Sequence, residues 1–428
     1  MSGWRGFFSF VLALVLGSGT AHAQDDTEAL LKQRVGQVVA VMQGKRDAAE
    51  TFDARFLSEV PAERLRALTS QIAAQGGAVE GYADFKREQQ RSATFTLKLA
   101  NATAPARIEL GSGDKPLVAG FRIFAVTPAG DSLDKLDADF AALPGKAGFA
   151  VYRLGDDAPV LAKGREVTTP FAVGSSFKLY VLAALARQVK EGKRRWSDVV
   201  LVSGKSFPSG TVHTLPDGAP VTVHTLASLM ISISDNTATD MLVRLAGQEA
   251  LAREVRLARH ARPEAMAPIM TTAQLFALKR GGDVVTERYA SASPQERQRQ
   301  LDALDLSRVA EADPGEVFGH GPVAIDRIEW FASPADLAGV MNDLRRLDSR
   351  EAFDILAINP AMDSATARTR AYVGYKGGSE DGVMSMTWLL QGKSGAWSVV
   401  TGSWNDPKAP IDNKRFEVLM LRLAKLAG

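Results

Sequence analysis

Cysteine is absent from this chain of 428 residues, and histidine is scarce. The absence of cysteine excludes disulfides, thiolate metal sites and a cysteine nucleophile. The five histidines show no His-x-x-x-His spacing and no accompanying cluster of acidic residues, so we expect neither a metal site nor a cofactor. The Gly-x-Ser-x-Gly motif of α/β-hydrolases is also missing. A serine nucleophile in this chain would therefore need a base other than histidine, and lysine is the obvious candidate.

An excess of charge of either sign is lacking as well. The net charge is +2, and the sequence contains no block of basic residues. We therefore expect neither nucleic acid nor an anionic membrane surface as a partner. A hydrophobic content of 46% with 23% charged residues is ordinary for a globular protein. A chain of 428 residues exceeds what one core usually serves, which predicts two or more domains.

No apolar run is long enough to span a membrane. The run Phe7–Leu16 is shorter than the ~20 residues that a spanning helix needs. It follows Arg5 and precedes the small-x-small sequence Ala21-His22-Ala23, and this order is typical of a signal peptide. We therefore expect residues 1–23 to be cleaved, and the mature protein to be periplasmic or secreted without a membrane span.

Residues 24–130 are predicted to form a small α+β domain. Apolar residues recur at helical spacing through 27–75, whereas Thr94–Leu99 and Leu117–Val126 alternate with the period of a strand. The turn-forming segment Pro128–Asp131 marks the expected boundary.

A second domain is predicted over residues 140–428. Its expected strands are Gly148–Leu154, a short run around Val160, Met384–Leu390 and Trp397–Gly402; its expected helices are Ser175–Val189, Thr225–Leu245, most of 280–345 and Arg415–Leu426. Within 280–345, Ser293 and Ser333 each precede a proline and begin capping motifs. Strands at both ends of a helical middle predict a sheet assembled from segments distant in sequence.

Ser175-Ser176-Phe177-Lys178 is the first candidate for chemistry. Two residues three positions apart share one face of a helix, and a desolvated lysine is able to take a proton from a serine hydroxyl. Ser-x-x-Lys also occurs at Ser112–Lys115 and Ser132–Lys135. Only the third occurrence follows a predicted strand and opens a strongly apolar helix, where free N–H groups stabilise an oxyanion. This context favours Ser175 as nucleophile and Lys178 as base.

Two further motifs follow along the chain. Ser234-Asp235-Asn236 is a polar turn between apolar helical stretches. Such a turn is often only a helix cap, but buried polar groups are costly without partners. In Tyr375–Ser379 the adjacent glycines allow a substrate backbone to approach a strand edge, and Lys376 is able to anchor a carboxylate. Taken alone, this last segment reads more simply as a β-turn with a surface lysine.

In the order Ser-x-x-Lys, Ser-Asp-Asn and Lys-Gly-Gly, the three motifs resemble the signature set of class A β-lactamases and penicillin-binding proteins. The flanking sequences Thr169–Lys178 and Leu226–Asp240 are similar too, and the resemblance covers roughly 140–428. It implies a class A β-lactamase-like domain with an antiparallel sheet flanked by helices and an all-helical subdomain. The arrangement with a small domain ahead resembles the two-domain serine hydrolases of clavulanic acid gene clusters. That likeness implies a cystatin-like (steroid-isomerase-like) first domain, to which no catalytic residue is assigned.

The resemblance implies a role for each matching residue of the catalytic machinery. Ser175 would be acylated, and Lys178 would act in proton transfer. Ser234 would shuttle a proton to the leaving nitrogen, with electrostatic help from Lys376. The backbone N–H groups of Ser175 and Ser379 would form the oxyanion hole.

The substrate-binding residues implied by the resemblance are Asn236, Gly377, Gly378 and Ser379, of which Asn236 would contact an amide side chain. Gly377 departs from the family pattern, because the family has Thr or Ser there and uses its hydroxyl to bind the substrate carboxylate. We therefore expect a weakened grip on the carboxylate of a β-lactam.

The glutamate that activates the deacylating water in class A enzymes is missing. It normally stands four residues before an asparagine, but neither Asn342 nor Asn359 has a glutamate at that distance. Glu264 is the nearest substitute by position, although a surface carboxylate is the simpler interpretation.

These features predict an exported serine hydrolase acylated at Ser175 by a β-lactam or a related amide or ester, with slow hydrolysis of the acyl-enzyme. One alternative is a D-alanyl-D-alanine peptidase or an esterase acting on a small exported substrate. A second alternative is a non-catalytic binding protein on the same fold. The expected partner is a small molecule, while the true substrate and the oligomeric state are not determined by the sequence.

Overall fold

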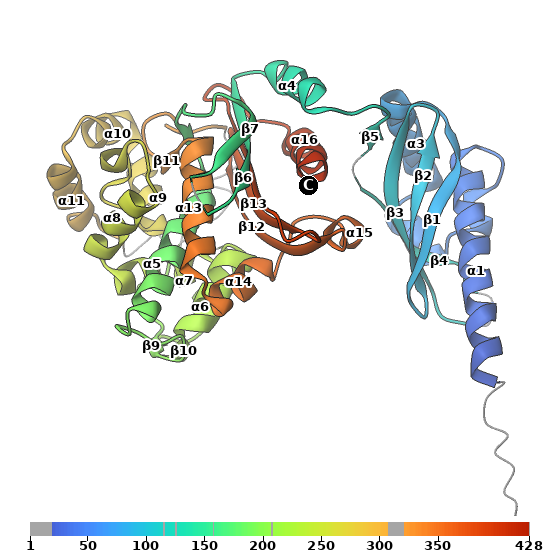
Figure 1. Cartoon of the computed structure of the whole chain (residues 1–428), viewed down its shortest axis with the longest axis horizontal. Helices are drawn as coiled ribbons and strands as arrows, with labels where there is room; N and C mark the ends of the chain where they lie inside the picture. Colours follow the sequence, from blue (N-terminus) through green and yellow to red (C-terminus); the bar gives the residue numbers. More distant parts are fainter. Residues whose placement is uncertain are drawn as a thin grey trace, which may run out of the picture. The chain divides into compact units, whose positions relative to one another are not determined.

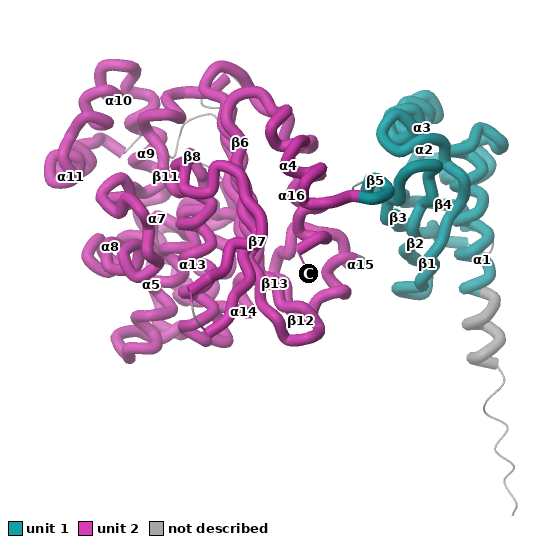
Figure 2. Tube along the Cα trace, turned by 45° about the horizontal axis from the view of Figure 1, so that its top comes forward, with its two compact units in different colours: residues 1–130 teal, residues 131–428 magenta. Residues whose placement is uncertain are grey.

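The computed structural model describes residues 19–427, apart from 114–115, 125, 157, 207–208 and 307–320. The charged and apolar parts of the expected signal peptide, Arg5 and Phe7–Leu16, lie outside the described residues. Among the helices that are described, none combines the length and apolarity needed to cross a membrane. The chain divides into two compact units, Met1–Gly130 and Asp131–Gly428 (Figure 2).

The first unit consists of helices followed by an antiparallel sheet. Its elements are α1 (Gly19–Met42), the 3₁₀ helix η1 (Ala48–Glu50), α2 (Ala54–Glu59), α3 (Ala62–Gly76), β1 (Val79–Gln89), β2 (Ser92–Leu99), β3 (Ala102–Leu110), β4 (Val118–Ile123) and β5 (Thr127–Pro128). The strands pair in the order β1-β2-β3-β4, and β5 pairs with β3. The core lies between α1 and one face of this sheet, where Leu31, Val35 and Val38 are buried.

The sequence pattern predicts β2 and β4 but misses β1 and β3. In β1 only Val79 is buried, so the strand carries little of the alternation by which a half-buried strand is recognised. In β3 the buried positions include Ala102, Ala104 and Ala106, whose small side chains give a weak strand signal.

The second unit opens with α4 (Leu133–Ala141), β6 (Lys146–Leu154), β7 (Val160–Arg165), β8 (Phe171–Ala172), η2 (Gly174–Phe177), α5 (Lys178–Lys190), β9 (Val199–Leu201), η3 (Val212–Thr214) and β10 (Pro220–Thr222). Its helical middle comprises α6 (Val223–Ser232), α7 (Asn236–Ala246), α8 (Gln248–Leu257), η4 (Pro263–Met266), α9 (Thr272–Arg280), α10 (Gly282–Ala290) and α11 (Pro294–Asp302). It closes with β11 (Phe331–Ala332), α13 (Pro334–Leu347), α14 (Arg350–Ala357), α15 (Ser364–Ala367), β12 (Arg370–Glu380), β13 (Val383–Gly392), β14 (Trp397–Asn405) and α16 (Asn413–Leu426).

The main sheet of this unit joins the two ends of its sequence. The strands run β12-β13-β14-β6-β7, all antiparallel, and the junction between the distant segments is the β14–β6 pair, with Trp397 opposite Leu154. This confirms the predicted sheet of distant segments. Helices α4 and α16 cover one face, and α13 with α5 behind it covers the other (Figure 1).

The second unit begins at Asp131, earlier than the expected residue 140. Arg422 of α16 forms ion pairs with Asp131 at 2.7 Å and with Asp139 at 2.8 Å. Helix α4 is therefore fixed to α16 and packs as part of the second unit.

The interpretation of Tyr375–Ser379 as a turn is wrong, because this segment lies inside β12. Residues of the strand pair along its length with β13, with Gly377 opposite Met386 and Ser379 opposite Met384. Two adjacent glycines and a lysine hide the strand in the sequence, since these residue types are depleted in strands.

The predicted helix starts agree with the structure in their capping. Ser333 forms a capping box with Asp336 at the start of α13, and Ser293 accepts the N–H of Glu296 at the start of α11. The expected helix Ser175–Val189 begins as the 3₁₀ turn η2 before continuing as α5, and the predicted polar break at Ser234 separates α6 from α7.

The segment leading into η2 is held from two sides. The Asn405 side chain accepts the N–H of Ala172 at 2.8 Å and donates to its carbonyl at 3.0 Å. The N–H of Val173 donates to the Trp330 carbonyl at 3.0 Å, and the Phe177 ring stacks on the Trp330 indole with centroids 3.8 Å apart. These contacts fix the position of the 3₁₀ turn that carries Ser175.

Candidate active site

Ser175 is the one residue between Phe171 and Tyr180 that is not buried. The preceding Gly174 has a φ of +48°, a conformation that glycine adopts without penalty. A β-carbon on Gly174 would lie 3.2 Å from the backbone nitrogen of Ser379. Glycine at this position therefore allows η2 to approach the edge strand β12 while one serine hydroxyl stays accessible.

Gly378 makes the same approach possible from β12. A β-carbon there would overlap the carbonyl oxygen of Val173 and the backbone nitrogen of Ser175. The two glycines thus bring the backbone nitrogens of Ser175 and Ser379 to the same crossing of η2 and β12. This is where the resemblance places the two oxyanion-hole donors.

Another Ser-x-x-Lys segment has a structural explanation. Ser132 is the N-cap of α4 and accepts the N–H of Lys135 at 3.2 Å. In the remaining segment, Lys115 lies outside the described residues.

The Lys178 ammonium reaches the turn that joins α6 and α7. Lys178 is fully buried, and its Nζ donates to the carbonyl of Ser234 at 2.7 Å, to the Ser234 hydroxyl at 3.1 Å and to Asn236 Oδ1 at 3.0 Å. Three positions separate it from Ser175 at the η2–α5 junction. The structure therefore brings the first two motifs into direct contact through a lysine.

Lys376 approaches the same hydroxyl from the sheet. Its buried Nζ donates to Ser234 Oγ at 3.1 Å and also to the carbonyl of Gly377. A hydroxyl has two lone pairs and one proton. Because the two lysines engage the lone pairs of Ser234 Oγ, its proton remains as the donor for a further group.

Burial lowers the pKa of both lysines. Desolvation brings the pKa of Lys178 down to about 7, although the nearby carboxylates of Asp240 and Asp235 act in the opposite direction. Desolvation, together with the charge on Lys178, holds the pKa of Lys376 well below its ordinary value. A neutral Lys178 is thus accessible near neutral pH, as a base requires.

Ser234 has a φ of +60°, which is uncommon for a residue with a side chain. The adjacent Asp235 carboxylate explains how this conformation is held. Fully buried, it accepts the N–H groups of Thr211 at 2.6 Å, of Val212 at 2.8 Å and of Ala238 at 2.8 Å, the last as N-cap of α7. The buried polar turn is therefore satisfied, and its rigidity aims Ser234 at the two lysines.

Asn236 follows as the first residue of α7. Its side-chain amide oxygen, Oδ1, accepts from Lys178, so the side chain lies beside the base. Its contact with the amide side chain of a substrate stays a prediction.

Two acidic centres near the site were not predicted from the sequence. The buried Asp240 accepts from the backbone N–H of Thr272 at 2.6 Å, from its hydroxyl at 2.8 Å and from the N–H of Ala273, which fastens α7 to α9. Single aspartates of this kind carry no spacing signal in a sequence, because their partners come from another helix.

The second centre lies at the end of β12. Lys279 of α9 pairs with Glu329 at 3.3 Å and with Glu380, the residue after Ser379. Burial and the neighbouring Glu329 raise the pKa of Glu380 well above its ordinary value. This cluster joins the edge strand to the helical part of the unit and so supports the position of Ser379.

Gly377 lacks the hydroxyl of the family pattern for a reason visible in the structure. A β-carbon at this position would overlap the Tyr375 hydroxyl, two residues earlier on the same face of β12, and would lie 3.1 Å from the Ser385 carbonyl. The Tyr375 ring also packs on Trp388, with centroids 4.9 Å apart. The glycine therefore accommodates a tyrosine that the sequence reasoning did not single out.

Glu264, the substitute considered for the deacylating base, is an exposed residue of η4. Within the part of the chain that the structure describes, no group of histidine and acidic side chains is arranged to hold a metal ion.

The model of the beta-lactamase enzyme family matches residues 132–357, more than half of the chain. The chain belongs to the beta-lactamase enzyme family. The class A β-lactamase-like fold is thereby confirmed for the second unit of this family member, whereas the cystatin-like nature of the first unit stays a prediction.

Solved structures similar to this beta-lactamase family member include a beta-lactamase from Sphaerobacter thermophilus, with 21% identity and a TM-score of 0.47, covering 69% of this chain and 97% of that one. A beta-lactamase from Chitinophaga pinensis has 17% identity and a TM-score of 0.46, covering 68% and 96%. An acyl-enzyme complex of PBP-A with penicillin G has 17% identity and a TM-score of 0.45, covering 68% and 95%. No curated protein matches the chain.

Removing the Asp235 carboxylate tests its role in holding the Ser234 turn. Asp235→Ala leaves three N–H groups without their acceptor, and we expect a loss of about 3 kcal/mol in the free energy of unfolding. Asp217→Ala is the control, since Asp217 is 80% exposed in its pair with Lys205 and contributes less than about 1 kcal/mol. Chemical denaturation measures both; equal small losses would contradict the role given to Asp235.

Introducing the family hydroxyl tests the account of Gly377. Gly377→Thr forces the Tyr375 side chain to move, and we expect it to cost about 1–3 kcal/mol of stability, as overpacking typically does. Gly81→Thr on β1 is the matched control, because nothing lies within 4 Å of a β-carbon there. A fully stable Gly377→Thr protein would show that the glycine is not required by Tyr375.

Proposed function

We propose that this family member is an exported serine hydrolase, acylated at Ser175 by a β-lactam or a related amide or ester, that hydrolyses the acyl-enzyme slowly. The observation that carries the proposal is the pair of buried lysines on the Ser234 hydroxyl. This arrangement supplies a base on one side of the reacting centre and a proton donor for the leaving group on the other. Export rests on the predicted signal peptide.

Acylation follows from the groups in place. Neutral Lys178 takes the proton of Ser175 as Oγ bonds to the substrate carbonyl carbon, and the carbonyl oxygen becomes an oxyanion facing the N–H groups of Ser175 and Ser379. Losing one such donor typically lowers a rate on the order of 10²–10³-fold. When the carbon–nitrogen bond breaks, the leaving nitrogen takes the Ser234 proton, and Ser234 takes a proton in turn from a lysine. For an ester, the leaving oxygen takes that proton.

Slow deacylation is supported by the carboxylates near the site. Hydrolysis of the acyl-enzyme needs a base for the attacking water. Glu264 is exposed, and Glu380 is engaged in the ion-pair cluster with Lys279. Among the groups that the structure describes at the site, Lys178 is already placed as a base, and we expect it to serve both steps.

Gly377 favours the esterase form of the second candidate, a D-alanyl-D-alanine peptidase or an esterase on a small exported substrate, because a D-Ala-D-Ala peptide ends in a carboxylate as a β-lactam does. The missing hydroxyl would bind the carboxylate of a β-lactam. An ester that has no carboxylate therefore loses less binding affinity from its absence than a β-lactam does. A non-catalytic binding protein is the remaining alternative, and the experiment below separates the three.

Intact-protein mass spectrometry after mixing with penicillin G and with a chromogenic cephalosporin tests acylation directly. We expect an adduct that clears slowly in the wild type and no adduct in Ser175→Ala. Ser132→Ala, which removes the serine of another Ser-x-x-Lys segment, is the control and should retain the adduct.

Each outcome of that experiment is informative. A permanent adduct with turnover of a simple ester or a D-Ala-D-Ala peptide supports the second candidate. No adduct with any β-lactam or activated ester contradicts the proposal and leaves the binding protein.

The pH dependence of acylation tests the base. Below about pH 7 Lys178 is protonated and cannot accept the Ser175 proton, whereas above it the neutral form prevails. The acylation rate constant should therefore rise with pH and level off above a midpoint near 7. Lys178→Met should lower the plateau on the order of 10²–10⁴-fold and abolish this rise. A rate that falls as pH increases through 7 would rule out a neutral Lys178 as the base.

A further inference from the structure

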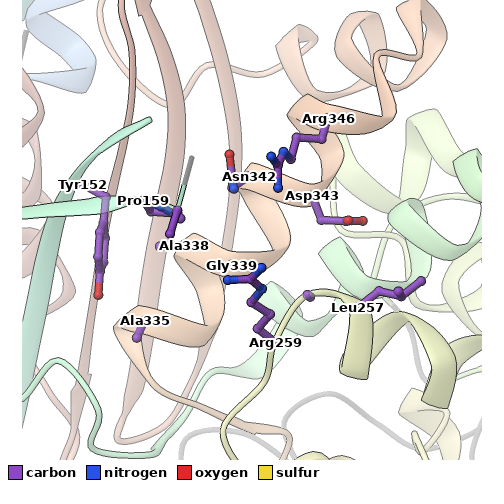
Figure 3. Close-up of a pocket in the computed structure, with 12 residues that line it drawn as sticks. Tyr152, Pro159, Leu257, Arg259, Ala335, Ala338, Gly339, Asn342, Asp343 and Arg346 are labelled. Carbon is purple, nitrogen blue, oxygen red and sulfur yellow. The ribbon is translucent and has the colours of Figure 1, made fainter. Parts of the chain in front are cut away.

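A cavity of about 180 Å³ lies away from the candidate active site. Figure 3 shows it between helix α13 and the turn that ends α8, with Tyr152 of β6 on its far side. Ser175, Lys178, Ser234 and Lys376 are all absent from its lining. What distinguishes this cavity is the chemistry of its polar groups.

Arg259 stands where a helix end favours glycine. It has a φ of +59°, its N–H donates to the Arg256 carbonyl at 3.0 Å, and the N–H of His260 donates to the Val255 carbonyl at 3.1 Å. This hydrogen-bond pattern is the Schellman ending of a helix, whose left-handed position is usually glycine. An arginine there is conformationally penalised, which points to a use for its side chain.

Gly339 brings this turn against α13. A β-carbon on Gly339 would overlap the carbonyl oxygen of Ala258. Glycine inside a helix is itself unfavourable. Arg259 and Gly339, which meet in space, are therefore both residues that cost some conformational stability where they stand. The result is that the exposed Arg259 guanidinium lies over the middle of α13 (Figure 3).

Arg346 supplies a second guanidinium from α13, two turns after Gly339. It donates to the backbone carbonyl of Asp156 at 2.6 Å. Among the described residues, neither Arg259 nor Arg346 has a carboxylate partner. Asp343, the acidic residue of the lining, is already paired with Arg187 at 2.6 Å.

The remaining polar groups of the lining also suit an anion. Asn342 accepts from Arg345 through its carbonyl oxygen at 3.2 Å, which leaves its amide nitrogen as a donor. Figure 3 shows Asn342 and the Arg346 guanidinium close together. The rest of the lining is largely apolar and includes Tyr152, Pro159 and Ala338.

We propose that this cavity binds a small organic carboxylate, whose anionic group lies between Arg259 and Arg346 and whose apolar body lies against Tyr152, Pro159 and Ala338. Paired guanidinium groups are the preferred partners of a carboxylate. The volume is below that of an ordinary drug-sized pocket, so the ligand is the size of a simple aromatic or branched acid. The proposal is independent of the hydrolase function.

Titration of the Ser175→Ala protein with benzoate, followed by two-dimensional NMR, tests the proposal. We expect saturable shifts at residues around the cavity, and Arg346→Gln should raise the dissociation constant at least about tenfold. Arg256→Gln is the matched control, since Arg256 is an exposed arginine of α8 outside the lining, and it should leave the constant unchanged. Inorganic phosphate, titrated in parallel, should bind more weakly because it makes no use of the apolar wall.

Arg259→Gly separates binding from folding. Because glycine suits the left-handed position, we expect this variant to melt at the wild-type temperature or above it while losing benzoate affinity at least about tenfold. The proposal is overturned if benzoate does not bind, if binding survives both arginine replacements, or if phosphate binds more tightly than benzoate. A lower melting temperature with unchanged affinity would show that Arg259 has a structural role only.

Discussion

The burial of two lysines around one serine hydroxyl is the constraint on which the site depends. Taking an ammonium group out of water is costly unless it is well paired or gives up its proton. Lys178 and Lys376 share Ser234 Oγ, and their other hydrogen bonds in the described structure go to backbone carbonyl oxygens and to the side-chain amide oxygen of Asn236. The pKa values of both lysines are therefore lowered. Each loses its proton more readily than an ordinary lysine, which reduces the cost of a buried charge and allows it to act as an acid or a base.

The rest of the second unit can be understood as holding this arrangement. Asp235 fixes the left-handed turn of Ser234 through three backbone N–H groups, and Asp240 fastens α7 to α9. Gly174 and Gly378 let η2 and β12 meet closely enough to place two backbone nitrogens together. The three motifs come from distant parts of the chain. The β14–β6 pairing joins the C-terminal strands, which include β12 with Lys376, to the strands that precede η2, whereas the Ser234 turn lies between helices α6 and α7.

Local sequence patterns predicted much of this arrangement, because they are set by local physics. Caps at Ser293 and Ser333, the break at Ser234 and the strands of β6, β13 and β14 follow from spacing and capping rules. The strand β12 was missed because it contains glycines, which have a low strand propensity. One of them, Gly378, allows the backbone of η2 to approach β12 closely. Asp240 and the Lys279–Glu380 pair were missed because their partners lie far away in sequence. Tyr375 was missed because its contacts with Gly377 and Trp388 depend on β12, which was not predicted as a strand. The contacts of Ser175, Lys178, Ser234 and Lys376 are described by the structure, while their catalytic roles stay predictions.

The proposed mechanism requires Lys178 to be neutral near pH 7. An NMR titration of protein labelled with ¹³C and ¹⁵N in lysine measures it without substrate, and the spectrum of Lys178→Met assigns the resonance. We predict a single lysine signal that is lost in this variant and titrates with a midpoint near 7, as its burial requires. A Lys178 signal that stays in the charged form up to the ordinary lysine range of about 10 would contradict the account.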